Sequence, residues 1–267
     1  MKNFFISNNM MHPFHLVSFS PWPIMVSINI MNLAISASWL FTMNNWSPFM
    51  ISLTSLMISI FQWWRDVIRE SSFQGFHSTW VHKGLKVGMI LFIISEIMFF
   101  ISFFWMLLHM ALAPSMEIGC LWPPNNILTF NPYSVPLLNT SILISSGISV
   151  TWSHHSMLNS LKYESVVSLL ITILLGIYFS FIQYMEYWTS SFTIADSVFG
   201  SSFFVMTGFH GIHVLIGSMM LMVCWIRLLL NHFSSIHHFG FEAAAWYWHF
   251  VDVVWLFLYV LIYWWSY

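Results

Sequence analysis

The stretch Gly88-Met-Ile-Leu-Phe-Ile-Ile-Ser-Glu-Ile-Met-Phe-Phe-Ile-Ser-Phe-Phe-Trp105 is apolar apart from two serines and one ionisable side chain, Glu96. Insertion scales put an ionisable side chain such as Asp at the centre of a membrane helix at roughly 2.5–3.5 kcal/mol. Two interpretations of Glu96 follow. It either relays protons, or it is a protonated acid that forms a hydrogen bond inside a helix bundle.

The composition of the whole chain agrees with this stretch. Of its 267 residues, 58% are hydrophobic and 6% are charged, whereas soluble domains carry about 25% charged residues. The net charge of −2 excludes a basic surface for nucleic acid, and two cysteines are too few for a disulfide framework. The composition therefore predicts an all-α integral membrane protein.

Seven segments are long and apolar enough to be membrane spans, which need roughly 20 residues. They cover residues 22–42, 47–64, 85–110, 134–152, 165–185, 198–226 and 242–265. With seven spans, every lysine and arginine falls on one face: Lys2, Arg65, Arg69, Lys83, Lys86, Lys162 and Arg227. The positive-inside rule makes that face cytoplasmic, or the matrix side in a mitochondrion. The amino terminus is then inside and the carboxyl terminus outside.

Polar side chains inside the third and sixth spans are candidates for a buried site. Gly88, Ser95 and Ser102 recur every seven residues beside Glu96 and form a stripe that lets another helix approach closely. In the sixth span, His210 and His213 share a helix face. These histidines are candidates for hydrogen bonding to Glu96 or to the last span, and ligation of a metal or haem is the competing interpretation.

The last span carries a second polar stripe. At 100° per residue, Glu242 and His249 nearly superpose, and Asp252 lies within about 60° of them. Hydrogen bonding between helices and proton conduction both explain such a stripe. The histidine pairs 154–155 and 237–238 are predicted to lie in loops on the basic face.

A basic and aromatic cluster ends the second span on the same face. Trp63 and Trp64 fit an interfacial aromatic belt. Arg65 and Arg69 share a helix side, and Asp66 can pair with Arg69. Either this is a solvated salt-bridge cluster, or the arginines capture lipid head groups.

Several stretches together carry a resemblance to a known family. They are Ser20-Pro-Trp-Pro23, Gln62-Trp-Trp-Arg-Asp-Val-Ile-Arg-Glu70, Gly88 to Glu96, Trp122-Pro-Pro124, Thr207-Gly-Phe-His-Gly-Ile-His-Val214 and the block from His237 to Trp255. From about His12 to its end, the chain closely resembles the subunit III family of mitochondrial cytochrome c oxidase. Residues 1–10 look like an extra leader, with Met11 an alternative start.

The resemblance implies a specific architecture. Helices one and two form a pair, helices three to seven form a bundle, and lipid fills a V-shaped cleft between them. We therefore expect an N-terminal segment at 1–15, the helix pair at 16–70 and the bundle at 71–267. Arg69 and Arg227 match family positions that hold phospholipid head groups. The full set that we assign to lipid is Trp63, Trp64, Arg65, Arg69, Glu70, His77 and Arg227.

The resemblance also implies a function. The expected protein is a non-redox core subunit of the proton-pumping oxidase that passes electrons from cytochrome c to oxygen, in the mitochondrial inner membrane. Haem and copper belong to the partner subunits I and II, and further accessory subunits complete the complex. This chain would support assembly, ordered lipid, oxygen access and proton uptake. The alternatives are a proton-coupled transporter using Glu96 and His210, and a haem-binding membrane cytochrome.

Overall fold

The computed structural model describes residues 14–267, so Lys2, the expected leader and most of the expected 1–15 segment lie outside the described residues. Residues 14–267 contain seven α-helices, one 3-10 turn, one π-helical turn and no strand. The helices are α1 (Trp22–Met43), α2 (Ser47–Ser72), α3 (Thr79–Leu112), α4 (Val135–Leu158), α5 (Lys162–Thr189), α6 (Ser197–Leu229) and α7 (Phe239–Leu258). The turns are η1 (Met116–Ile118) and η2 (Tyr259–Trp264), and η2 continues α7.

Six of these helices have the length and apolar composition of a membrane span, which confirms a multi-pass all-α membrane protein. The exception is α2. It has 26 residues, but serine and threonine dilute its apolar part and Arg65, Asp66, Arg69 and Glu70 occupy its end. Whether α2 crosses the membrane therefore stays a prediction.

The helices extend beyond the predicted spans. The third begins at Thr79 rather than 85, and the fourth runs to Leu158 rather than 152. The predicted spans end where apolar residues become sparse, whereas each helix continues until a turn ends its backbone hydrogen bonding. As a result, several side chains expected in loops stand on helices.

The chain divides into two compact units, with the boundary between residues 85 and 86 inside α3. In the first unit, α1 packs along α2. Small polar side chains form that contact: Asn29 donates to Ser59 at 3.0 Å, and the hydroxyls of Ser36 and Ser52 are 2.6 Å apart. Small residues allow close helix approach, and their hydrogen bonds link the helices where water is absent.

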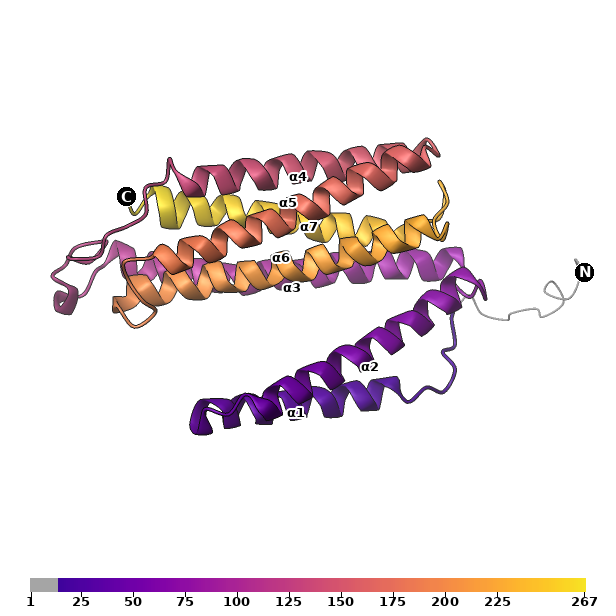
Figure 1. The fold of residues 1–267 in the computed structure, drawn as a ribbon, viewed down its shortest axis with the longest axis horizontal. Helices are drawn as coiled ribbons and strands as arrows, with labels where there is room; N and C mark the ends of the chain where they lie inside the picture. The colour runs from indigo at the N-terminus through magenta and orange to yellow at the C-terminus, as the bar shows by residue number, and fades with distance from the viewer. Residues whose placement is uncertain (1–13) are drawn as a thin grey trace, which may run out of the picture. The chain divides into compact units, whose positions relative to one another are not determined.

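In the second unit, α4, α5, α6 and α7 run alongside one another, and α3 joins them through large side chains (Figure 1). Aromatic pairs connect α3 to α6 and α7, including Phe99 with Phe209 at 5.1 Å and Phe104 with Phe257 at 5.9 Å between ring centroids. The shorter side chains of the other four helices permit closer packing. Ser149 on α4 and Thr172 on α5, for example, are in hydrogen-bond contact at 2.8 Å.

Trp248 on α7 is the centre of this unit. Its side chain is fully buried, and its indole N–H donates to Ser146 Oγ on α4 at 2.9 Å. Gly176 on α5 and Gly217 on α6 lie against its ring, where an added Cβ would stand 2.6 Å and 2.9 Å from ring atoms. Four helices thus meet at one indole, and the two glycines make room for it.

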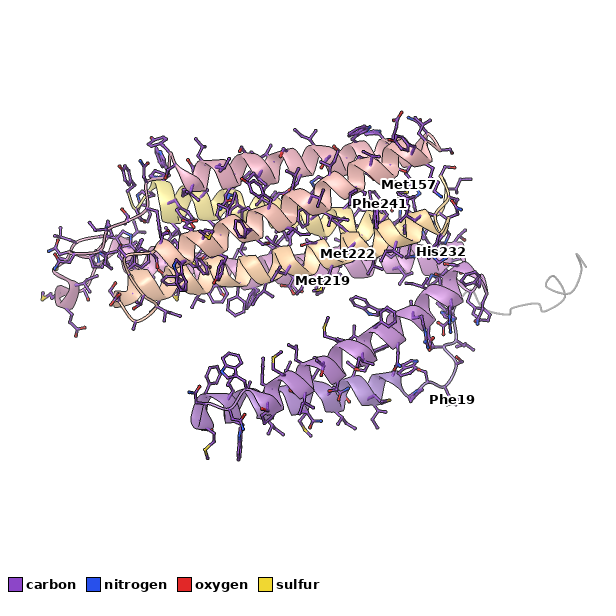
Figure 2. The ribbon with its side chains drawn as sticks, viewed as in Figure 1. Phe19, Met157, Met219, Met222, His232 and Phe241 are labelled. Carbon is purple, nitrogen blue, oxygen red and sulfur yellow. The ribbon has the colours of Figure 1, made fainter. Side chains whose placement is uncertain are left out.

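Serine is tolerated in these spans because its hydroxyl can bond within its own helix. Ser95, Ser102 and Ser141 each donate to the carbonyl three residues earlier, at 2.6–2.7 Å. The polar group is then satisfied without a partner helix, as lipid requires. The outer side chains are mainly apolar, and Met219 and Met222 project from α6 (Figure 2).

Candidate functional site

Glu96 on α3 contacts His213 on α6. Glu96 Oε2 and His213 Nε2 are 2.9 Å apart, and the two side chains are 23% and 10% exposed. The other ring nitrogen of His213, Nδ1, lies 2.7 Å from the carbonyl oxygen of Phe209. A carbonyl only accepts, so Nδ1 is the donor in that bond. Nε2 is then the ring nitrogen that faces the Glu96 carboxyl group.

Aromatic rings enclose His213. Phe100 meets its ring edge-on at a centroid distance of 5.0 Å, while Tyr247 stacks on it at 6.2 Å and Phe99 at 6.4 Å. Phe250 adds a further edge contact at 6.2 Å. These rings surround the imidazole and hold it facing Glu96.

His210 does not contact Glu96; it contacts the last span, the other hydrogen-bond partner expected for these histidines. Its Nε2 lies 3.3 Å from the carbonyl oxygen of Val251 on α7, and its ring is packed against Phe179 and Trp255. The two histidines share a face only loosely, since three residues correspond to 300° around the helix. That offset turns His210 to α5 and α7 and His213 to α3.

The stripe of small residues on α3 does not meet another helix of its own unit. Gly88, Ser95 and Ser102 are exposed, and nothing lies within 4 Å of a Cβ added at Gly88. Glu96 points away from that stripe, toward α6. The helix approach expected at the stripe is therefore absent from the 86–267 unit.

The polar side chains of α7 fall into two separate groups. Glu242, in the first turn, pairs with Lys86 Nζ on α3 at 2.7 Å. His249 Nδ1 and Asp252 Oδ2 are 3.9 Å apart beside Gly147 of α4, and Asp252 Oδ1 has no hydrogen-bond partner among the described residues. Within residues 14–267, no hydrogen bond or ion pair joins Glu242 to His249.

A buried polar group at the other end of the bundle was not predicted. Glu186, expected outside the fifth span, is 3% exposed on α5 next to Gln183 and Tyr263. Gln183 donates to the hydroxyl of Tyr263 at 3.4 Å and accepts from Asn139 at 3.4 Å. The spacing of Gln183 and Glu186, three residues apart on one helix face, is the signal that could have revealed it.

In the first unit, Asp66 lies between two arginines beyond the apolar part of α2. It is 3.2 Å from Arg65 and 3.8 Å from Arg69, and it accepts a 2.6 Å hydrogen bond from the indole of Trp22. That indole bond, aided by the arginines, lowers the pKa of the Asp66 carboxyl below its ordinary value. Arg65 and Arg69 remain 41% and 57% exposed, so their guanidinium groups can bind a further anion.

The other residues assigned to lipid surround this cluster. Glu70 lies 3.8 Å from His15, and His15 meets the ring of His77 edge-on at 5.7 Å. Trp64 is 55% exposed and Trp63 half-buried. These positions fit the head-group region, where amphipathic aromatic rings are common.

Arg227, on α6 in the second unit, is a half-buried cation. Its guanidinium lies over the ring of Phe233 at 4.4 Å and against Gly240. Among residues 14–267, no carboxylate lies within 4.0 Å of it.

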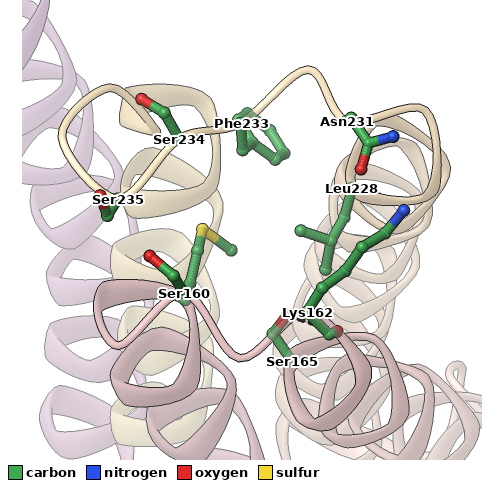
Figure 3. Close-up of a pocket in the computed structure, with 9 residues that line it drawn as sticks. Ser160, Lys162, Ser165, Leu228, Asn231, Phe233, Ser234 and Ser235 are labelled. Atoms are coloured by element: carbon green, nitrogen blue, oxygen red, sulfur yellow. Dashed lines mark hydrogen bonds between the residues drawn. The ribbon is translucent and has the colours of Figure 1, made fainter.

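A cavity of about 270 Å³ opens between the α4–α5 turn and the loop before α7. Ser160, Lys162, Ser165 and Ser234 line it (Figure 3). The Lys162 amine donates to the backbone carbonyl of Leu229 at 3.1 Å, so it is already engaged.

The histidine pairs do not all lie in loops, contrary to the sequence analysis. His154 stands on α4, and His238 is buried at the start of α7. Together with Glu242 they form one group of three ligand-bearing side chains. The 154–155 pair lies on a helix because α4 is longer than predicted, whereas the 237–238 pair lies in the loop before α7, as predicted.

Comparison with known proteins places the chain in a family. The family model described as cytochrome c oxidase subunit III matches residues 12–267. Cytochrome c oxidase subunit 3 of Locusta migratoria is 54% identical over 261 residues, which cover 98% of this chain and 99% of that protein. The Bos taurus and Pisaster ochraceus proteins of the same name are 56% and 55% identical over 255 residues, covering 96% of this chain and 98% of each. On this match, the chain belongs to the cytochrome c oxidase subunit III family.

Proposed function

We propose that this chain is a non-redox core subunit of a cytochrome c oxidase in the mitochondrial inner membrane. The observation that carries this role is the Glu96–His213 pair, in which the ionisable groups hold each other in place. A proton path needs successive groups within hydrogen-bond reach. Among the described residues, no hydrogen bond or ion pair extends this pair to a further ionisable side chain.

The same proposal assigns the redox chemistry to partners. Haem and copper would reside in subunits I and II, and this chain would stabilise that core together with accessory subunits. Support for oxygen access and proton uptake would then act through the assembled complex. A proton-coupled transporter using Glu96 and His210 is less well supported, because His210 bonds to Val251 and not to Glu96.

We further propose that the inner-face arginines hold phospholipid head groups. Arg69 is exposed beside Asp66, and Arg227 has no carboxylate partner among residues 14–267. A phosphate group offers the bidentate acceptor that a guanidinium prefers. The lipid-filled cleft between a helix pair and a five-helix bundle belongs to this proposal.

Replacing Glu96 by Gln tests the supporting role. Gln keeps the size of the side chain and can still hydrogen-bond to His213, but it cannot release a proton. We expect the purified oxidase to retain most of its oxygen consumption and its ratio of protons pumped to electrons transferred. Near-complete loss of pumping, with assembly intact, would refute the supporting role and favour a proton-carrying Glu96.

Replacing Arg69 and Arg227 together by Gln tests the lipid assignment. We expect the purified complex to lose tightly bound phospholipid, measured by mass spectrometry of lipid extracts. Lys83→Gln is a matched control, because it removes a positive charge from an exposed side chain stacked near Trp80. Equal lipid retention in the double variant and in the control would contradict the assignment.

A further inference from the structure

Three ligand-bearing side chains converge near the basic end of the bundle. His154 lies in the last turns of α4, His238 immediately precedes α7, and Glu242 stands in the first turn of α7. One ligand atom from each side chain lies within 4.8 Å of the other two. His238 Nε2 is 3.4 Å from His154 Nε2 and 3.6 Å from Glu242 Oε1.

These distances suit a shared cation better than direct hydrogen bonds. Hydrogen bonds between nitrogen donors and their acceptors are normally 2.7–3.2 Å long, and both separations exceed that range. Around a tetrahedral zinc ion, bonds of about 2.0–2.1 Å place neighbouring ligand atoms about 3.3–3.5 Å apart. Two imidazoles and one carboxylate also form a ligand set that zinc uses in proteins.

The buried histidine is oriented as a metal ligand. His238 is 3% exposed, and its Nδ1 donates to the backbone carbonyl of Ser234 at 3.0 Å. This bond fixes the proton on Nδ1 and leaves the lone pair of Nε2 directed at His154 and Glu242. Metal-bound histidines characteristically donate their other N–H to a carbonyl or carboxylate in this way. The Ser234 hydroxyl also accepts the backbone N–H of His237 at 3.0 Å, which closes the loop that positions His238.

The Lys86 ammonium already pairs with Glu242 and would compete with a metal ion for this carboxylate. The ammonium lies 2.7 Å from Glu242 Oε2, on the carboxylate oxygen opposite the one that faces His238. The ammonium offsets the carboxylate charge, and it would repel an incoming dication. Binding of a metal must therefore overcome, or displace, this ion pair.

We propose that His154, His238 and Glu242 form a binding site for a zinc-class divalent cation, with Lys86 competing for Glu242. The nitrogen ligands favour zinc or cadmium over magnesium, which prefers oxygen ligands. The site lies apart from the Glu96–His213 pair and does not depend on the supporting role proposed above. A fourth position would be filled by water.

Equilibrium dialysis with radioactive zinc, applied to the purified oxidase that contains this chain, tests the proposal. Zinc bound elsewhere in the complex is constant, so the differences between variants are informative. We expect His154→Gln to weaken zinc binding at this site at least about tenfold. The matched control is His155→Gln, which removes the adjacent, exposed histidine and should leave binding unchanged.

Lys86→Gln provides a second, independent measurement, because it removes the competitor and no ligand. We expect the Lys86→Gln variant to bind zinc more tightly. Excess magnesium should not displace the zinc. If His154→Gln prevents assembly, Lys86→Gln decides the question. Unchanged zinc affinity in Lys86→Gln, or equal losses in His154→Gln and His155→Gln, would overturn the proposal.

Discussion

Glu96 and His213 satisfy one another's hydrogen-bonding groups at 2.9 Å. Nδ1 of His213 donates to the carbonyl of Phe209, so both ring nitrogens of the histidine have a polar neighbour. The pairing avoids an unpaired polar group in the apolar part of the bundle, which explains how Glu96 can be accommodated there.

A double-mutant cycle measures this coupling. Glu96→Leu and His213→Leu each leave one buried polar partner unsatisfied, which costs roughly 1–3 kcal/mol. We expect the double variant to be less destabilised than the sum of the two single variants, as judged by the temperature at which the chain dissociates from the purified oxidase. His109→Leu, at an exposed histidine of α3, is the control and should have little effect. Strict additivity would show that the two side chains are not coupled.

Sequence reasoning identified Glu96 and both histidines but could not choose between the histidines. An apolar span predicts that an acid faces protein, because exposure to lipid is costly. The choice of His213 depends on the rotation of α6 about its axis, which Trp255, Phe179 and the rings around His213 fix together. Those contacts join residues far apart in the chain, and no local pattern encodes them.

Two glycines set the packing of α5, α6 and α7. Gly176 and Gly217 leave space for the Trp248 ring, whereas Gly211, on the same helix as Gly217, has nothing within 4 Å of an added Cβ. Helix lengths and apolar composition were readable from the sequence. The contact of these two glycines with Trp248 could not be predicted, because it depends on how the helices are aligned along their axes.

This difference within α6 predicts opposite responses to one substitution. Gly217→Ala should destabilise the subunit by about 1–3 kcal/mol, because the new methyl group would overlap the indole. Gly211→Ala should be neutral or slightly stabilising, since alanine favours helix more than glycine does. Thermal dissociation of the subunit from the purified complex measures both variants. Equal effects at the two positions would contradict the packing described around Trp248.

Over the whole molecule, the number of membrane crossings depends on α2. Six helices are long and apolar enough to cross a membrane, and α2 is less apolar. The charge distribution favours seven crossings, because it places all seven Lys and Arg residues on one face.

Epitope tags at the two ends distinguish the alternatives. With seven crossings, an N-terminal tag should be protected from protease added to mitochondria whose outer membrane has been removed, and a C-terminal tag should be cleaved. Solubilising the inner membrane should expose both tags, which controls for intrinsic resistance to cleavage. Protection of both tags, or cleavage of both, would show an even number of crossings.

Trp248 also has a consequence for biosynthesis. Ribosomes deliver a chain from its amino end, so α4, α5 and α6 enter the membrane before the indole that fills the space between them. Until α7 arrives, Gly176, Gly217 and the hydroxyl of Ser146 face an unfilled gap. A nascent chain stalled before α7 would therefore present three helices with an incomplete contact surface, a distinctive substrate for membrane chaperones and quality-control proteases.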